Sequence, residues 1–189
     1  DHNILNSLAA ISVAIEMGMT EENIRNGLEK FKGIKRRFEI KGMTNNGVIV
    51  VDDYGHHPVE IQNSLHAARM IAGKNKVIAV IQPHRYSRLK SLFNDFCSCF
   101  NDADFLLVSE VFSAGEDPII NFGQNSLIQG IRDFGHQNVF GLNNHKDLAK
   151  IISDQIHEGD IVILLGAGSI TKWSDTLISD LDAIGGQKL

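Results

Sequence analysis

The stretch KVIAVIQPHRYSR, residues 76–88, decides the fold class of this chain. Its first seven residues are mostly apolar, and a second run of the same kind, DIVILL, occupies residues 160–165. Such runs are typical of strands that a parallel sheet buries on both faces. The polar residues after the first run would then lie at the carboxyl end of a buried strand, where open α/β sheets bind their ligands.

Extended and helical patterns alternate along the rest of the chain. Strands separated by single helices indicate βαβ units and a mostly parallel sheet, so the predicted fold class is α/β with flanking helices. The turn signal NNG at residues 45–47 predicts a hairpin at the start of this sheet. The predicted strands are 37–43, 48–53, 76–82, 104–109, 138–142 and 160–165. The predicted helices are 3–17, 21–31, 58–72, 87–100, 124–134, 145–157 and 169–182.

Composition and charge narrow the class of protein. The chain has 189 residues, of which 43% are hydrophobic and 22% are charged, as is ordinary for a globular protein. A net charge of −5 argues against a nucleic-acid surface, and no apolar run is long enough for a membrane span. The spacing of Cys97 and Cys99 is wrong for a redox C-x-x-C motif, so we predict free thiols in a reducing cytosol.

A change of pattern divides the chain into two parts. An all-helical start gives way to strands at Phe31–Lys35, and we place the domain boundary there. The sequence opens with DHNILNSLAA and enters a helix directly, without a leader. This start indicates that the sequence is a piece of a longer protein.

The segment DDYGHHP, residues 52–58, follows a predicted strand and offers carboxylates and imidazoles. Adjacent residues of an extended segment point in opposite directions, so Asp52 and Asp53 cannot both face one ligand. Three interpretations stay open at this point. The segment is a substrate or nucleotide site, a capped helix start with Pro58 in its first turn, or a zinc site that lacks a recognisable third ligand.

Two arginine pairs are candidates for anion binding. Arg85 and Arg88 are three residues apart, so both lie on one face if a helix starts there. Two guanidinium groups at the end of a strand can hold a carboxylate or a phosphate in a fixed orientation. The alternative is a solvated basic helix end. The pair in RRF, residues 36–38, is likewise either a surface charge pair or part of a site.

The segment LLGAGSIT, residues 164–171, has a glycine turn between a strand and a helix. Thr171 stands where the third glycine of a dinucleotide-binding motif belongs, which argues against that function. The pattern instead predicts a tight turn that lets a ligand or backbone approach closely. No P-loop motif occurs in the sequence, and Asn3 taken alone would be a helix N-cap.

Taken together, these segments resemble the Mur ligase family. The similar segments occur in the family's order between residues 2 and 170, and they are HNILN, GIKRRFE, DDYGHHP, QPHRYSR, FSAGEDP and LGAGSI. DDYGHHP and QPHRYSR are the most specific, and they are similar to the branch that joins L-alanine to UDP-N-acetylmuramate. Alternatives are the related ligase that attaches a recycled tripeptide, and a non-catalytic anion-binding α/β module. A dinucleotide-dependent oxidoreductase is the third alternative.

The resemblance implies a cytoplasmic bacterial enzyme of peptidoglycan precursor synthesis that uses ATP and Mg²⁺. It implies that residues 1–32 are the last helices of a central ATP-binding domain and that residues 33–189 are a C-terminal domain with a Rossmann-like sheet. The P-loop and the magnesium ligands would lie in the parts of the parent chain that this sequence lacks. The expected partners are ATP, L-alanine and UDP-N-acetylmuramate, with no nucleic acid and no membrane span.

The resemblance also implies roles for single residues. We expect nucleotide contacts from one group of side chains, namely His2, Asn3, Asn6, Arg37, Asp53 and Tyr54. We expect contacts to the amino acid from a second group, namely His56, His84, Arg85 and Arg88. Arg37, near the transferring phosphoryl group, and His56, as a base for the amine, are the expected catalytic residues, and no metal ligand is expected in this chain.

Overall fold

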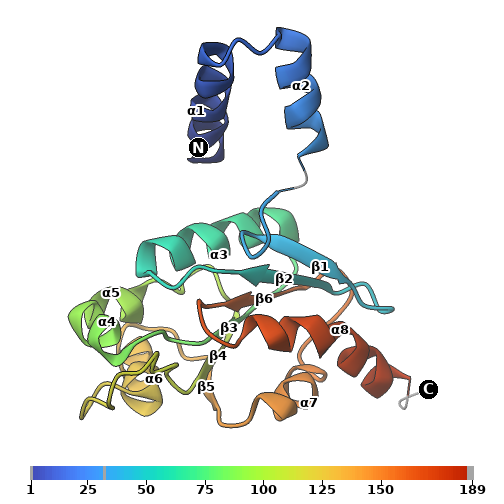
Figure 1. Ribbon diagram of the computed structural model, residues 1–189. Coiled ribbons are helices and arrows are strands. Elements are labelled where there is room, and N and C mark those ends of the chain that lie inside the picture. The colour runs from blue at the N-terminus through green and yellow to red at the C-terminus, as the bar shows by residue number, and fades with distance from the viewer. Residues whose placement is uncertain (1, 32, 187–189) are drawn as a thin grey trace. The chain divides into compact units, whose positions relative to one another are not determined.

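The computed structural model describes residues 2–31 and 33–186, and for residues 2 and 3 it describes the backbone alone (Figure 1). The chain divides into two compact units, Asp1–Ile34 and Lys35–Leu189. The division falls within the interval Phe31–Lys35 in which the sequence changes from helical to extended patterns. Each unit is described separately below.

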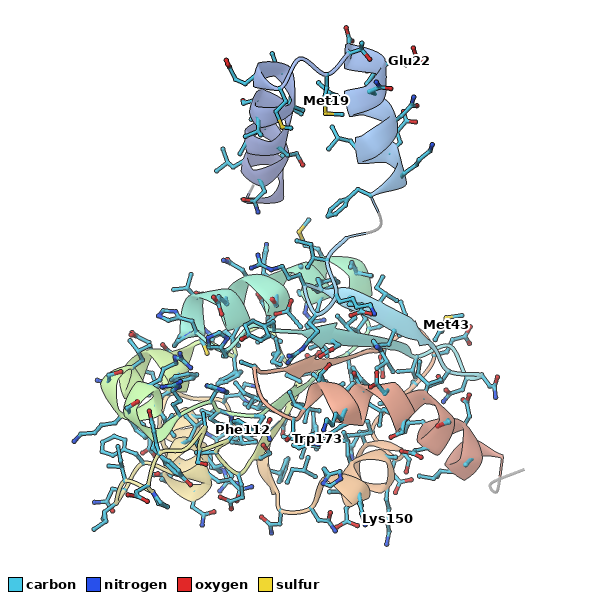
Figure 2. The ribbon with its side chains drawn as sticks, in the orientation of Figure 1. Met19, Glu22, Met43, Phe112, Lys150 and Trp173 are labelled. Carbon is cyan, nitrogen blue, oxygen red and sulfur yellow. The ribbon has the colours of Figure 1, made fainter. Side chains whose placement is uncertain are left out.

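The first unit is a pair of helices, α1 (His2–Glu16) and α2 (Glu21–Lys30). Both were predicted, and Thr20 caps α2 as expected, because its side chain accepts a hydrogen bond from the N–H of Asn23 at 3.3 Å. Several apolar side chains of the pair are largely exposed, among them Ile4 at 63% and Ile15 at 61%. Figure 2 shows the side chains of this unit and labels Met19, which lies between α1 and α2 in the sequence.

The second unit is built on a six-stranded sheet with the order β1-β2-β6-β3-β4-β5. Neighbouring strands are parallel except for the antiparallel hairpin of β1 and β2. The predicted α/β class, the mostly parallel sheet and the N-terminal hairpin are therefore confirmed. The strands are β1 (Glu39–Met43), β2 (Ile49–Asp53), β3 (Val77–Ile81), β4 (Phe105–Ser109), β5 (Val139–Leu142) and β6 (Ile161–Leu165).

Helices cover both faces of the sheet (Figure 1). One core cluster joins α3, α5 and α6 to one face, and a second joins α7 and α8 to the other. Because successive strand residues point to opposite faces, Ala79 belongs to the first cluster and Val80 to the second. These helices are α3 (Pro58–Ala72), α4 (Tyr86–Ser91), α5 (Phe93–Ser98), α6 (Gln124–Asp133), α7 (Leu148–Ile152) and α8 (Thr171–Gly185), with a 3₁₀ turn η1 (His145–Asp147).

Two predicted helices differ from the structure. The helix expected at 87–100 is two helices, α4 and α5, because Leu92 leaves helical geometry with φ −119° and ψ 25° and packs its side chain on the core. The helix expected at 145–157 is the turn η1 followed by the short α7. Beyond α7 the backbone forms a tighter turn than an α-helix, since the N–H of Gln155 donates to the carbonyl of Ile152, three residues earlier.

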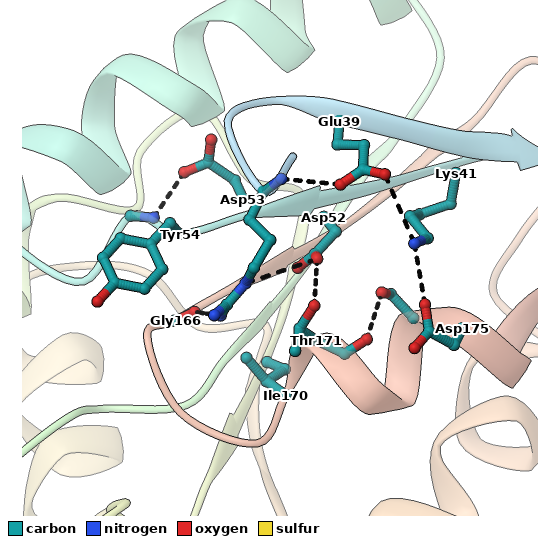
Figure 3. Close-up of polar contacts among 12 residues, drawn as sticks. Glu39, Lys41, Asp52, Asp53, Tyr54, Gly166, Ile170, Thr171 and Asp175 are labelled. Carbon is teal, nitrogen blue, oxygen red and sulfur yellow. Dashed lines mark hydrogen bonds and ion pairs between the residues drawn. The ribbon is translucent and has the colours of Figure 1, made fainter. Parts of the chain in front are cut away.

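A buried polar network joins the hairpin, β2 and α8 (Figure 3). Asp52, at the end of β2, is fully buried and accepts a hydrogen bond from the Thr171 hydroxyl. Arg36 Nη2 donates to the Gly166 carbonyl at 2.7 Å, and Arg36 Nε lies 3.8 Å from Asp52 Oδ2. Burial raises the pKa of Asp52 above its ordinary value, although the Thr171 bond and the Arg36 charge oppose this rise. The network fixes the turn before α8 against the end of β2.

We predict that Thr171→Val destabilises the second unit by about 1–3 kcal/mol, because it leaves the buried Asp52 carboxylate without this donor. Thr176→Val is the matched control, since Thr176 is exposed on the same helix, and we expect it to change stability by less than about 0.5 kcal/mol. Urea unfolding of the 189-residue chain measures both. Equal stabilities for the two variants would show that the Asp52–Thr171 bond does not hold α8 in place.

Candidate active site

Three polar loops meet at the carboxyl edge of the sheet because β2, β6 and β3 are parallel neighbours. A fourth loop, after β4, lies next to the β3 loop. The first three loops, helix α4 and the residue after it, Leu92, border an open cleft of about 710 Å³. The residues that line it are Tyr54, His56, His84, Arg85, Ser87, Arg88, Ser91, Leu92 and Ala167.

Asp53 holds the loop after β2 in shape. Its Oδ1 accepts hydrogen bonds from the Gly55 N–H at 2.7 Å and the Ser64 hydroxyl at 2.9 Å. Its Oδ2 accepts one from the Phe38 N–H at 2.7 Å. These bonds give both oxygens of the buried carboxylate partners within the chain. A contact of Asp53 with a nucleotide remains a prediction, and the structure gives this residue a loop-fixing role.

The second half of the same loop starts helix α3. His57 is the N-cap, and its Nδ1 accepts a hydrogen bond from the Val59 N–H. The Glu60 carboxylate accepts bonds from the N–H groups of His56 and His57 at 3.0 and 3.2 Å. Burial alone would raise the pKa of Glu60, but these two donors outweigh it and hold the pKa below its ordinary value. The end of DDYGHHP, at His57 and Pro58, is thus a capped helix start. Its middle, at Tyr54 and His56, lines the cleft.

The His56 side chain faces the cleft in a defined tautomer. Its Nδ1 lies 2.9 Å from the Tyr54 carbonyl oxygen. A carbonyl can only accept, so Nδ1 carries the hydrogen and Nε2 of the neutral ring keeps a free lone pair. The Tyr54 ring packs edge-on against this imidazole, with 5.1 Å between the ring centroids. His56 can therefore accept a proton from a ligand in the cleft.

His84 has the opposite tautomer. Its Nδ1 lies 3.2 Å from Arg88 Nη1, which also donates to the His84 carbonyl at 2.9 Å. A guanidinium group can only donate, so Nδ1 accepts and the hydrogen of the neutral ring is on Nε2. Burial and then the charge of Arg88 lower the pKa of His84. The ring stacks on Phe112, with a centroid distance of 5.3 Å.

Arg85 and Arg88 both line the cleft, so the structure brings together the four residues expected to contact the amino acid. Arg85 precedes α4 and has an unusual positive φ of 71°. Its backbone N–H donates to the Phe112 carbonyl at 2.9 Å. Its side chain is 50% exposed, and Nη1 lies 3.7 Å from Glu116 Oε1.

The two arginines of RRF have different environments. Arg36 turns into the fold, where its guanidinium group bonds Gly166 and lies 4.8 Å from the centroid of the Tyr54 ring. Arg37 is exposed, and within residues 2–31 and 33–186 its side chain has no hydrogen bond or ion pair. Arg36 is structural, whereas Arg37 has no charged partner among the described residues and does not line the cleft.

The other expected nucleotide contacts lie in the first unit. Asn6 is exposed on α1. The side chains of His2 and Asn3 are outside the described residues. The roles of all three toward a nucleotide stay predictions.

Gln82, for which the sequence predicted no role, joins β3 to the GAGS turn. Gln82 is buried, its Nε2 donates to Ser169 Oγ at 3.1 Å, and its Oε1 accepts from the Ile170 N–H at 3.1 Å. A Cβ atom on Gly166, whose φ is 153°, would lie 2.9 Å from the Gln82 carbonyl oxygen. The tight turn with a close backbone approach is therefore present. The position of Gln82, directly after a buried apolar run, was the signal in the sequence that could have indicated its role.

No group of three or more metal-binding side chains occurs in the described part of the chain. Cys97 and Cys99 are buried free thiols, as predicted, and burial raises the pKa of Cys97 to about 11. No helix among the described residues is long and apolar enough to cross a bilayer.

Comparison with known proteins places the chain in a family. Residues 36–168 match the family model described as Mur ligase, glutamate ligase domain. The chain is 54% identical over 185 residues to UDP-N-acetylmuramate–L-alanine ligase of Rhodospirillum centenum, an alignment that covers 98% of the chain and 38% of that protein. The enzyme of the same name from Phenylobacterium zucineum is 52% identical over 183 residues, with 97% and 38% covered. The chain thus spans about 38% of the length of these relatives.

Solved structures agree with this assignment. The crystal structure of UDP-N-acetylmuramate–alanine ligase from Thermotoga maritima has a TM-score of 0.79 at 27% identity, covering 97% of this chain and 38% of that one. A murein peptide ligase from Psychrobacter arcticus has a TM-score of 0.65 at 24% identity, covering 96% and 37%, and shows a shared fold. The chain belongs to the Mur ligase family.

Proposed function

We propose that this chain is the amino-acid-binding, C-terminal portion of an ATP-dependent ligase that joins L-alanine to UDP-N-acetylmuramate in the bacterial cytoplasm. The observation that carries the proposal is the cleft, which gathers two arginines and two imidazoles on a chain more than half identical to ligases of that name. A simple anion-binding module needs the arginines but has no use for the imidazoles.

The reaction requires an activated carboxylate, because a free carboxylate would have to expel oxide. In the proposed reaction the lactyl carboxylate of the sugar attacks the γ-phosphorus of ATP, the bond from that phosphorus to the bridging oxygen breaks, ADP leaves, and an acyl phosphate forms. The amine of L-alanine then attacks the acyl carbon, phosphate leaves, and the amide forms. The tasks of the protein are to position the reactants and to neutralise phosphate charge.

The cleft residues fit the amino-acid side of this reaction. Arg85 and Arg88 provide guanidinium donors for the alanine carboxylate, and a carboxylate held between them has a fixed orientation. His56 Nε2 has the free lone pair that can take a proton from the alanine ammonium, which makes the amine nucleophilic. His84 presents its Nε2–H beside them.

In this proposal, the chain supplies only some of the residues that contact the nucleotide. The unpaired, exposed Arg37 suits a polyphosphate, since its charge is permanent and has no competing partner among the described residues. The described residues include no magnesium-binding cluster, so we place the Mg²⁺ ligands and the P-loop in a central domain outside this chain. We assign residues 1–32 to that domain, because the exposed apolar side chains of α1 and α2 suit a helical pair that packs on further structure.

The test of the proposed function is the alanine dependence of ligation in the full-length protein. We expect Arg85→Ala and Arg88→Ala to raise the KM for L-alanine by about tenfold or more, because each removes a charge-assisted bond to the carboxylate. The KM for ATP should stay within about twofold. Phosphate release measures both.

Lys90→Ala is the matched control, because Lys90 is a cation on α4 that does not line the cleft. An unchanged alanine KM in both arginine variants would mean that Arg85 and Arg88 form a solvated basic helix end and do not bind the carboxylate. Ligation of a tripeptide in preference to L-alanine would instead support the recycling ligase.

We predict that Arg37→Ala lowers kcat by about 100-fold, because removing one charge aligned with a transition state costs rate on this scale. The control is Lys35→Ala, which removes an exposed cation two residues away. Single-turnover measurement of acyl-phosphate formation isolates the step. A normal rate in Arg37→Ala would identify Arg37 as a surface charge with no role in the reaction.

We predict that Arg88→Met raises the pKa of His84, because the variant removes a nearby positive charge that disfavours the imidazolium. Burial still holds the pKa below its ordinary value in the variant. NMR titration of the histidine ring protons measures this shift, and Lys90→Met should leave it unchanged. A His84 pKa that does not rise would show that Nδ1 does not face the guanidinium group.

A further inference from the structure

We propose that Glu116 is a positioning residue that holds the Arg85 guanidinium group over the cleft. The inference rests on the proposed function of Arg85 and assigns a role to the loop after β4. Glu116 does not line the cleft. It acts on a ligand only through Arg85.

The loop after β4 contacts the start of α4 at several points. Glu116 accepts hydrogen bonds from the Ser87 N–H at 2.9 Å and the Ser87 hydroxyl at 2.6 Å. Phe112 accepts from the Arg85 N–H at 2.9 Å, and its own N–H donates to the Pro83 carbonyl at 2.8 Å. With the Phe112–His84 ring stack, these contacts fix the backbone on both sides of Arg85.

Arg85 depends on such support for two reasons. A φ of 71° is unfavourable for a residue with a Cβ atom and persists only where the surroundings impose it. The half-exposed side chain has many rotamers, and ordering it has an entropic cost. Among the described residues, Glu116 is the one carboxylate within ion-pair distance of its guanidinium group.

The geometry of the ion pair leaves Arg85 free to bind. A separation of 3.7 Å between Nη1 and Oε1 is too long for a hydrogen bond, so the guanidinium donors stay available for a ligand. The two bonds from Ser87 lower the pKa of Glu116 and keep it charged. Glu116 therefore attracts the guanidinium group without using its donors.

A second effect of the same charge has the opposite sign. A carboxylate near Arg85 also weakens the positive potential that a ligand carboxylate meets, so removing the charge would tighten binding if this effect dominated. Positioning predicts the reverse, a rise in the alanine KM. The sign of the change in the alanine KM therefore decides between the positioning effect and the effect on the potential.

The experiment compares Glu116→Gln with Asp117→Asn in the full-length ligase. Glutamine keeps an acceptor for the Ser87 N–H but removes the charge. We expect Glu116→Gln to raise the alanine KM by about fivefold to tenfold, with kcat and the ATP KM within about twofold. Asp117→Asn removes an exposed neighbouring charge and should leave all three unchanged. An unchanged or lower alanine KM in Glu116→Gln overturns the proposal.

A double-mutant cycle shows whether Glu116 acts through Arg85. In the Arg85→Ala background, Glu116→Gln should raise the alanine KM no further, because its target is gone. An additive rise would mean that Glu116 affects the site by another route, and the positioning role would be wrong. A general loss of structure would instead lower kcat and raise the ATP KM together.

A readout without catalysis separates this inference from the proposed function. In the 189-residue chain, ¹⁵N relaxation of the Arg85 Nε–H reports the order of the side chain. We expect Glu116→Gln, but not Asp117→Asn, to increase its mobility. If the wild-type ligase did not use L-alanine, the proposed function would fail while this measurement still tested Glu116. Unchanged mobility in Glu116→Gln would overturn the positioning role.

Discussion

The position of β6 in the sheet is the constraint on which the rest of the structure depends. It is the last strand in the chain, yet it pairs with both β2 and β3, and all its residues are fully buried. Since the pairings are parallel, the carboxyl ends of three strands lie side by side. The DDYGHHP and QPHRYSR loops thus flank the GAGS turn, although more than 75 residues separate that turn from either loop.

The cleft owes its chemistry to backbone and charge contacts that select tautomers. A carbonyl fixes the hydrogen of His56 on Nδ1, and a guanidinium group makes Nδ1 of His84 the acceptor. One imidazole therefore offers a lone pair at Nε2 and the other offers a hydrogen. Their ring centroids are 5.8 Å apart, and Tyr54 and Phe112 extend the row on either side. In the neutral rings, an acceptor nitrogen and a donor N–H group therefore line the same cleft.

Much of the fold could be predicted from local pattern, because the apolar runs and turn signals are strong. Helix 58–72, with Pro58 in its first turn, and the hairpin at NNG match the structure closely. The break at Leu92 could not be predicted, because core packing rather than helix propensity decides it. The place of β6 between β2 and β3 is equally a long-range outcome.

The candidate site was predicted less completely. Spacing brought Arg85 and Arg88 together, but it could not tell that Arg36 turns inward while Arg37 stays free. Glu116 had no local signal, because its partners are 29 and more residues away in sequence. Contacts of this kind depend on which loops the sheet order makes neighbours.

The most direct test of the proposed function is a structure of the full-length protein with bound UDP-N-acetylmuramoyl-L-alanine, the product of the proposed reaction. We predict that the carboxylate of the alanyl unit lies about 3 Å from the guanidinium nitrogens of Arg85 and Arg88. We also expect the amide nitrogen to face Nε2 of His56. A carboxylate bound by other residues, with both arginines in solvent, would contradict the proposed function.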